Sequence, residues 1–301
     1  MNCLIINNPV SGHSKTPEQI AEIVAKLGQK YQTVDVETTL PDVTATDIAR
    51  ENLGKYSLYV VLGGDGTLGE TLRSIAGKEN RPALGYIPCG TVNDFARSNK
   101  IPFEYRAAVD VILAGKTVKK GALFMNGTPA ASYVLAGMFT SSSYTANSKA
   151  KKKVGKLAYY YEILFNDKGR KGEQLEVTLD GDESTTYNSL HTLICFLNNK
   201  TVGGLRVTND EFDDNDTVYA LLAKRKKGFF GLLVSLGSMF PVLCKKAENS
   251  IIDTKNITIR RVKSATVKAF SPTTWNLDGE KGPVGNAEIS YKKDQFELLV
   301  P

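Results

Sequence analysis

The sequence is poor in the residues that build disulfide scaffolds and metal centres. It contains only four cysteines and two histidines, at Cys3, Cys89, Cys195, Cys244, His13 and His191. The cysteines are scattered, without the close pairs typical of a zinc site, and two histidines cannot make a histidine-rich centre. This cysteine usage fits the reducing cytoplasm.

A long apolar segment of the kind that crosses a membrane is also missing. The nearest approach is Gly228–Cys244, which is uncharged between Lys227 and Lys245 but short and interrupted by glycine, serine and proline. We expect a buried core helix here, ahead of contact with a membrane interface and well ahead of a span. The chain opens directly into the strand-like Cys3–Asn7, so no signal peptide is expected.

The composition excludes wholesale disorder and favours two domains. Hydrophobic residues make up 42% and charged residues 23% of the chain, and 301 residues is long for one compact domain. The excess of 38 Lys and Arg over 32 Asp and Glu gives a net charge of +6. A clustered basic face can meet nucleotide phosphate, nucleic acid or anionic lipid.

A glycine-rich turn stands between a predicted strand and a predicted helix. The apolar run Leu58–Leu62 ends in Gly63–Thr67, and Leu68, Leu72 and Ile75 then share one helical face. Three glycines in the turn let main-chain N–H groups close around an anion, and the helix N-terminus adds partial positive charge. An ordinary tight turn is the alternative.

Asp65 stands inside this turn. Bare phosphates would repel its carboxylate. The residue makes sense if it faces a phosphate-bound Mg²⁺ or takes a proton from an attacking hydroxyl.

The first part of the chain repeats strand–helix units. Strands are predicted at Leu4–Ile6, Thr33–Thr38, Leu58–Leu62 and Ala83–Ile87, with helices from Pro17, capped by Thr16, and over Thr46–Leu53. Such repeats predict a parallel, Rossmann-like sheet with its ligand loops at the carboxyl ends of the strands. Three loops should meet at that edge: Asn8–Gly12, Gly63–Thr67 and Pro88–Asp94.

Short alternating segments replace this pattern after about Phe124, separated by Gly, Asn and Asp turns. They are Tyr133–Gly137, Glu173–Leu179, Thr192–Leu197, Val218–Leu222, Ile257–Ile259, Ala265–Ala269, Ala287–Tyr291 and Phe296–Val300. This spacing predicts an antiparallel β-sandwich, with Leu157–Phe165 and Gly228–Cys244 as inserted helices. We therefore expect a Rossmann-like α/β domain at 1–124 and a β-sandwich domain at 125–301.

Several of these motifs together resemble the bacterial, soluble type of the diacylglycerol kinase and lipid kinase family, which is related to sphingosine kinases. The resemblance is carried by Asn8–Gly12, Gly63–Thr67 with Glu70, Gly90–Ala96, Lys156–Tyr159 and Asp278–Glu280. They occur in the expected order over nearly the whole chain. A GGDG turn alone is also similar to NAD kinases and phosphofructokinases, whereas GGDGT followed by GTVNDFAR is specific.

The resemblance implies an ATP-binding α/β domain, a β-sandwich domain, and a cleft between them where a lipid hydroxyl is phosphorylated. It places the nucleotide at Asn8, Pro9, Val10, Ser11, Gly12, Thr38, Gly63, Gly64, Asp65, Gly66, Thr67, Leu68, Gly69, Glu70, Thr91, Asn93 and Asp94. Phosphoryl transfer needs positioning and charge neutralisation, which fits ATP with Mg²⁺. Gly69 departs from the asparagine usual in the family.

The stretch Asp278-Gly279-Glu280 resembles the family motif that carries the proton acceptor. By itself, Asp-Gly between two strand-like runs predicts a hairpin turn. The resemblance implies that Glu280 is the general base and Asp278 a supporting carboxylate. Asp65 competes for the role of base.

An acidic turn, Asp210–Asp216, resembles a second Mg²⁺ site of the family. Carried over, the ligands are Asp214 and the main-chain carbonyls of Glu211 and Asp216, a set of oxygens that suits a hard cation. Asn215 replaces the usual glycine, and Val218 stands where a second Asp often follows. A solvated acidic loop is an equal alternative.

Two basic runs remain, Ser148–Lys156 and Lys224–Lys227, the second beside Phe229 and Phe230. Lysines next to apolar residues suit an anionic membrane surface, which we rank ahead of a merely solvated face. Nucleic acid ranks last, because no recognition motif accompanies the charges.

The sequence therefore predicts a cytoplasmic kinase, peripherally associated with the inner face of the membrane. It would use ATP and Mg²⁺ to phosphorylate a lipid alcohol, first of all diacylglycerol, giving phosphatidate and ADP. The alternatives are a soluble-substrate kinase of the NAD kinase type and a catalytically silent lipid- or nucleotide-binding regulator. Monoacylglycerol, sphingoid bases, phosphatidylglycerol and undecaprenol also present an alcohol, so the acceptor is left open, as is a homodimer.

Overall fold

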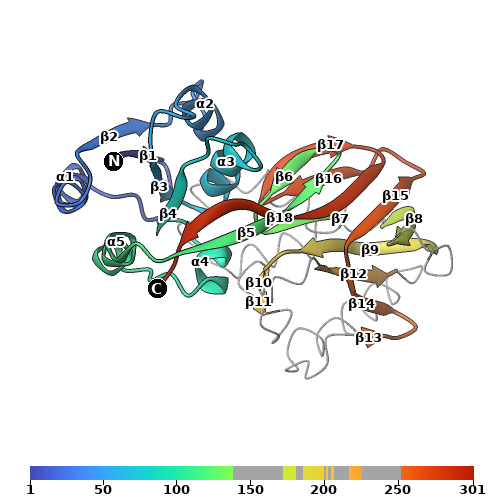
Figure 1. Ribbon diagram of the computed structural model, residues 1–301. Coiled ribbons are helices and arrows are strands. Elements are labelled where there is room, and N and C mark those ends of the chain that lie inside the picture. The colour runs from blue at the N-terminus through green and yellow to red at the C-terminus, as the bar shows by residue number, and fades with distance from the viewer. Residues whose placement is uncertain (138–171, 181–185, 200, 203–204, 207–216, 226–251) are drawn as a thin grey trace. The chain divides into compact units, whose positions relative to one another are not determined.

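The computed structural model describes residues 1–137, 172–180, 186–199, 201–202, 205–206, 217–225 and 252–301. The chain divides into two compact units (Figure 1). Unit 1 comprises Met1–Ala122, Pro129–Ala131 and Lys292–Pro301, and unit 2 comprises Leu123–Thr128 and Ser132–Tyr291.

This division differs from the expected boundary after residue 124. The boundary falls inside one strand, β5 (Thr117–Met125), and residues 292–301 belong with the first unit, not the second. The reason is strand pairing: Leu298, near the end of β18 (Ala287–Leu299), pairs in parallel with Leu84.

Unit 1 contains the predicted parallel sheet, in the order β18-β4-β3-β1-β2. Its other strands are β1 (Asn2–Asn7), β2 (Thr33–Thr38), β3 (Leu58–Gly63) and β4 (Ala83–Pro88). Its helices are α1 (Pro17–Leu27), α2 (Ala45–Glu51), α3 (Asp65–Ile75), α4 (Asp94–Ser98) and α5 (Tyr105–Ala114). Strand β3 is buried along its whole length, which explains its continuous apolar sequence, as expected for a central parallel strand.

Helices cover both faces of this sheet (Figure 1). On one face, Ile23 of α1 and Val109 of α5 join a core cluster with Val60. On the other face lie α2 and α3, and the buried Tyr59 donates its O–H to the Ala49 carbonyl of α2, at 3.1 Å. The strands are therefore held in place from two sides, which fixes the positions of their carboxyl ends.

The helix starts follow local capping rules. Thr16 caps α1 in a capping box with Gln19, and Pro17 occupies the first turn, as predicted. Helix α2 begins after Thr44, earlier than expected, because Thr44 and Asp47 form a second capping box. Helix α5 was not among the predicted elements; Glu104 caps it by accepting the Ala107 N–H.

Unit 2 is mainly antiparallel. Besides parts of β5 and β18, its strands are β7 (Tyr133–Gly137), β8 (Glu173–Leu179), β9 (Tyr187–Leu197), β12 (Val218–Lys224), β14 (Ile257–Val262), β15 (Ser264–Ala269), β16 (Thr274–Leu277) and β17 (Glu280–Val284). Short pieces complete the described strands: β6 (Thr128–Ala130, divided between the units), β10 (Thr201–Val202), β11 (Leu205–Arg206) and β13 (Ile252–Asp253). The predicted fold class, a Rossmann-like α/β unit followed by a mainly antiparallel β unit, is confirmed.

Strand β9 organises unit 2. One edge of β9 pairs with β12, while the other pairs with β8 at its start and with β7 at its end. Apolar side chains such as Leu135, Cys195 and Leu221 pack into one core cluster on these strands. Strand β7 also pairs with β16, and β16 forms a hairpin with β17.

The last strand corrects one prediction. Ala287–Tyr291 and Phe296–Val300 were expected as separate strands, but Ala287–Leu299 is continuous. The polar residues 292–295 suggested a break in the sequence. Main-chain pairing of β18 with β5 explains the continuity, because it needs no apolar side chains.

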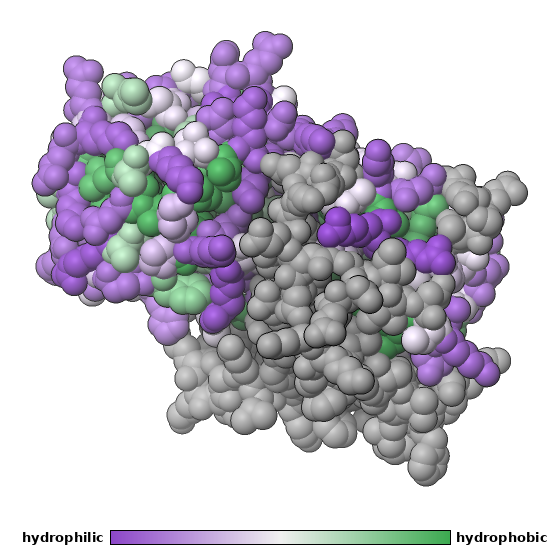
Figure 2. Space-filling model, turned by 60° about the horizontal axis from the view of Figure 1, so that its bottom comes forward, coloured by the Kyte–Doolittle hydropathy of each residue, from purple (hydrophilic) through white to green (hydrophobic). Residues whose placement is uncertain are grey.

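Several predicted features lie outside the described residues: the helices at 157–165 and 228–244, the acidic turn, and the basic runs apart from Lys224 and Arg225. Within the described part of the chain, no helix is long and apolar enough to cross a membrane. Figure 2 shows mostly hydrophilic side chains on the described surface in one view, with apolar ones in scattered groups.

Candidate functional site

Three loops leave the carboxyl ends of neighbouring parallel strands in unit 1 and contact one another. The Asn8 N–H donates to the Leu62 carbonyl at 2.9 Å, which joins the loop after β1 to β3. The Cys89 N–H donates to the Gly63 carbonyl at 2.7 Å, and the Cys89 carbonyl accepts the His13 N–H at 2.8 Å. The predicted convergence of the loops is confirmed.

Glycine is required where these loops touch. A Cβ atom on Gly90 would lie 2.8 Å from the Gly64 Cα, and one on Gly12 would lie 2.8 Å from the Thr91 Oγ1. Both distances are shorter than van der Waals contact. At Gly90 two main chains meet because no side chain stands between them, and at Gly12 the missing side chain leaves room for the Thr91 hydroxyl. The close approach of Gly64 and Gly90 brings main-chain groups of two loops together at the edge of the sheet.

Helix α3 begins at this junction without a side-chain cap. Its N-cap residue is Gly64, which has no side chain to accept the first N–H groups. Uncapped N–H groups together with the helix dipole form a ready anion site. The glycine turn is therefore suited to phosphate.

Two asparagines connect this turn to its neighbours. The Asn8 Nδ2 donates to the Thr67 Oγ1 at 2.8 Å, which ties the loop after β1 to the first turn of α3. The Asn7 Nδ2 donates to the Thr38 Oγ1 at 3.3 Å and so draws in the end of β2. Sequence reasoning missed Asn7; its position directly at the end of a buried strand was the available signal.

Asp65 makes a contact that the sequence did not predict. Its carboxylate accepts the N–H groups of Asp94, at 2.9 Å, and Phe95, at 3.2 Å. It thus caps α4 from another helix and ties the glycine turn to the loop after β4. Residues 29 and 30 positions apart in sequence meet here, which no local pattern reveals.

Asn93 braces the loop after β4 from within. It adopts a left-handed conformation with φ of 54°, its Oδ1 accepts the Gly90 N–H at 2.9 Å, and its Nδ2 donates to the Gly90 carbonyl at 2.8 Å. The buried Tyr86 hydroxyl also donates to this Oδ1, at 3.3 Å. Burial, reinforced by the charge of Asp65, raises the pKa of Tyr86 well above its usual value, so the phenol stays neutral.

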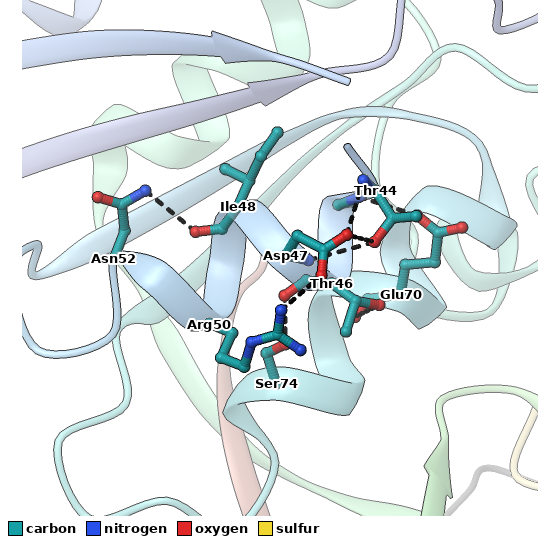
Figure 3. A network of polar contacts seen from close by, with 9 residues as sticks. Thr44, Thr46, Asp47, Ile48, Arg50, Asn52, Glu70 and Ser74 are labelled. Carbon is teal, nitrogen blue, oxygen red and sulfur yellow. Dashed lines mark hydrogen bonds and ion pairs between the residues drawn. The ribbon is translucent and has the colours of Figure 1, made fainter. Parts of the chain in front are cut away.

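Glu70 faces helix α2 (Figure 3). Its Oε2 accepts the Ala45 N–H at 3.0 Å, in the first turn of α2, and its carbonyl accepts the Thr46 hydroxyl at 3.0 Å. The Ser74 hydroxyl donates to the Thr46 carbonyl at 2.7 Å. The glycine-turn helix α3 is thereby linked along its length to the start of α2.

The nucleotide residues expected from the sequence differ in exposure. Val10 is 85% exposed and Thr91 is exposed as well, while Leu68 is fully buried in the core of unit 1. Gly69 is also buried, on the inner side of α3. The exposed members lie in the loops, where a ligand can reach them.

No cysteine described by the structure is suited to nucleophilic chemistry. Burial raises the pKa of Cys3 to about 12 and raises the pKa values of Cys89 and Cys195 as well. The thiolate, which is the nucleophile, is therefore scarce at neutral pH.

Unit 2 carries the candidate acid–base turn. Leu277 of β16 pairs with Glu280 of β17, and the two residues between them, Asp278 and Gly279, have φ values of 54° and 99°. Two central residues with positive φ form the tight hairpin that an Asp-Gly pair favours. The predicted hairpin turn is confirmed.

The two acidic residues of this turn have different surroundings. Asp278 is 2% exposed, and its Oδ1 accepts the N–H groups of Ser132, at 2.7 Å, and Tyr133, at 3.0 Å. Glu280 is exposed at the start of β17. Asp278 is therefore placed to hold the turn, whereas the Glu280 side chain is open to solvent.

The expected metal ligands Glu211, Asp214 and Asp216 lie outside the described residues. Among the residues that are described, no group of three or more His, Cys, Asp or Glu side chains is arranged to hold a metal ion.

Comparison with known proteins gives consistent matches. Residues 2–123 match the family model of the diacylglycerol kinase catalytic domain. A diacylglycerol kinase of Staphylococcus saprophyticus is 28% identical over 305 residues, covering 99% of this chain and 94% of the relative. One from Staphylococcus aureus strain MRSA252 is 29% identical over 302 residues, covering 99% and 91%.

Solved structures show the same fold. A crystal structure of a diacylglycerol kinase from Bacillus anthracis strain Sterne matches with a TM-score of 0.75 at 21% identity, covering 100% of this chain and 96% of that one. A second structure from the same organism gives 0.80 at 22% identity, with the same coverage. The three converging loops and the strands β1–β4 lie within residues 2–123, the segment that matches the diacylglycerol kinase catalytic domain family.

Proposed function

We propose that the protein is a lipid kinase that transfers the γ-phosphoryl group of ATP to the hydroxyl of a lipid alcohol. Diacylglycerol is the first candidate acceptor, with phosphatidate and ADP as products. The observation that carries the proposal is the uncapped start of α3 beneath three converging glycine loops, in a domain of this family. The names of the full-length relatives support a lipid acceptor.

The phosphates of ATP would bind at the start of α3. The main-chain N–H groups of the glycine turn and the exposed Thr91 hydroxyl supply donors, and the helix dipole favours the negative charge. In this proposal, Asp65, Glu70 and Asn93 act mainly by holding the loops, because their side-chain oxygens already accept main-chain N–H groups. The chain's task is positioning, which is the main protein contribution to phosphoryl transfer.

Mg²⁺ would supply charge neutralisation, bound largely through the phosphates, as is usual for this ion. A carboxylate whose two oxygens accept helix N–H groups has less capacity to serve as metal ligand or base, which supports Glu280 over Asp65 as the base. The second Mg²⁺ site at Asp214, with the carbonyls of Glu211 and Asp216, remains part of the proposal.

Glu280 would accept the proton of the lipid hydroxyl as that oxygen attacks the γ-phosphorus. An alcohol is a poor nucleophile at neutral pH, so a placed base contributes roughly 10²–10⁴-fold. Its exposure on the first residue of β17 supports this role. Peripheral association with an anionic membrane, through the basic runs, would bring the enzyme to its substrate.

An ADP-release screen tests the proposal. The purified protein is given ATP and Mg²⁺ with diacylglycerol, monoacylglycerol, a sphingoid base, phosphatidylglycerol or undecaprenol in mixed micelles, and NAD serves as the soluble control. We expect lipid-dependent ADP release, fastest with diacylglycerol. Turnover with NAD alone would favour a soluble-substrate kinase, and ATP binding without any turnover would favour a silent regulator.

A further inference from the structure

Asn276, in β16, is a buried polar residue with half of its amide unused. It is 0% exposed, and its Oδ1 accepts the Gly279 N–H at 2.8 Å. Its Nδ2 is buried and has no hydrogen-bond partner in the structure as described. The residue thus accepts one main-chain N–H of the turn and leaves one of its own groups unsatisfied.

Stability alone does not explain an asparagine here. A buried N–H₂ group without a partner costs about 1–3 kcal/mol, and its chain neighbours Trp275 and Leu277 are buried apolar residues. What the amide contributes is its accepting oxygen. Buried polar groups that are left without a partner, and that therefore break the usual rules of packing, are found mainly at functional sites.

The turn is held at two points of different kinds. Its first residue, Asp278, is bound to the backbone of the neighbouring strand: its N–H donates to the Tyr133 carbonyl at 3.1 Å, and its carboxylate accepts the N–H groups of Ser132 and Tyr133. Its second residue, Gly279, has a φ of 99° and the conformational freedom of glycine. The bond from its N–H to Asn276 fixes it.

Glu280 follows Gly279 directly, so the peptide between them sets where the Glu280 side chain starts. Fixing Gly279 therefore fixes the direction of Glu280. We propose that Asn276 is a positioning residue: it orients Glu280 for proton transfer from the lipid hydroxyl. This inference rests on the function proposed above, in which Glu280 is the base.

A double-mutant cycle tests the inference. We expect Asn276→Ala to lower kcat roughly 10–100-fold with KM for ATP within about threefold of the parent, because a misplacement of about 1 Å costs up to roughly 10²-fold. In a Glu280→Gln background, the same substitution should change the remaining kcat less than about threefold, because the residue that Asn276 orients no longer accepts a proton.

The matched control is Asn286→Ala. The Asn286 Oδ1 also accepts a main-chain N–H, that of Ala269, at 2.9 Å, but on the exposed surface of unit 2. Its loss should leave kcat within about twofold of the parent, since it orients no reacting group.

The outcomes separate the two claims. If Asn276→Ala lowers kcat equally in both backgrounds, Asn276 is structural and the inference is overturned. If Glu280→Gln leaves turnover unchanged, the base assignment fails and the inference fails with it. Should Asn276→Ala not fold, Asn276→Asp keeps the shape and an accepting oxygen. That variant should keep kcat within about tenfold of the parent. A larger loss in a variant with the parent's melting temperature overturns the inference.

Discussion

At the scale of single residues, Asp65 shows how one carboxylate can organise a site. It caps α4 through the N–H groups of Asp94 and Phe95, although it belongs to α3. If Asp65 is replaced by asparagine, one side-chain oxygen still accepts a hydrogen bond. The other becomes an N–H₂ group, which faces a main-chain N–H and cannot accept its hydrogen bond. The loops after β3 and β4 then lose part of their connection.

We therefore expect Asp65→Asn to fold but to lose at least roughly 100-fold in kcat/KM, with weaker ATP binding. Calorimetric ATP titration and turnover assays measure both effects. Asp47→Asn is the control, because Asp47 accepts from Thr44 within its own helix start. Activity of Asp65→Asn within tenfold of the parent, about 1.4 kcal/mol of barrier, contradicts the role.

His191 makes a prediction about pH. It is 1% exposed, and burial, helped by the charge of Lys224, lowers its pKa from 6.5 to about 4. The unfolded chain thus binds this proton below about pH 6.5, whereas the folded chain binds it only near pH 4. The contribution of His191 to the free energy of unfolding is therefore complete above pH 6.5. It falls by roughly 3 kcal/mol as the pH drops to about 4.

Urea titrations between pH 7 and pH 4 check this. His191→Leu should show a shallower loss of stability over that range than the parent, whatever its stability at pH 7. If the stability of the variant falls with pH as steeply as that of the parent, carboxylates elsewhere cause the whole effect and His191 does not contribute.

At the scale of secondary-structure elements, Glu70 couples α3 to α2 (Figure 3). Glu70→Ala removes an acceptor from the first turn of α2, which costs about 1 kcal/mol, and also loosens the helix that begins at the glycine turn. We expect KM for ATP to rise severalfold. Glu104→Ala removes a similar cap from α5 and should cost similar stability without changing KM.

The same scale shows what a sequence can predict. The strands Thr33–Thr38, Tyr133–Gly137 and Glu173–Leu179 begin and end as expected, because alternation or apolar runs mark them locally. The merging of β18 was missed, since its continuity depends on partners distant in sequence. The convergence of three loops followed from the rule that parallel strands bring their carboxyl ends to one edge.

For the candidate site, the motifs predicted that three loops converge but not which contacts each side chain makes. Asn93 was expected at the nucleotide, whereas its amide is engaged with Gly90 and Tyr86. Asn276 was not singled out at all. Such side-chain contacts depend on rotamers and on packing between segments, and neither periodicity nor spacing encodes them.

At the scale of the whole molecule, the central claim is transfer of the γ-phosphoryl group from ATP to a lipid. The most direct measurement uses γ-labelled ATP with Mg²⁺ and diacylglycerol in mixed micelles, followed by organic extraction. We expect label in organic-soluble phosphatidate with the parent, and roughly 10²–10⁴-fold less with Glu280→Gln at unchanged ATP affinity. A parent protein that binds ATP yet leaves the organic phase unlabelled, with diacylglycerol and with every other lipid alcohol, would contradict the account.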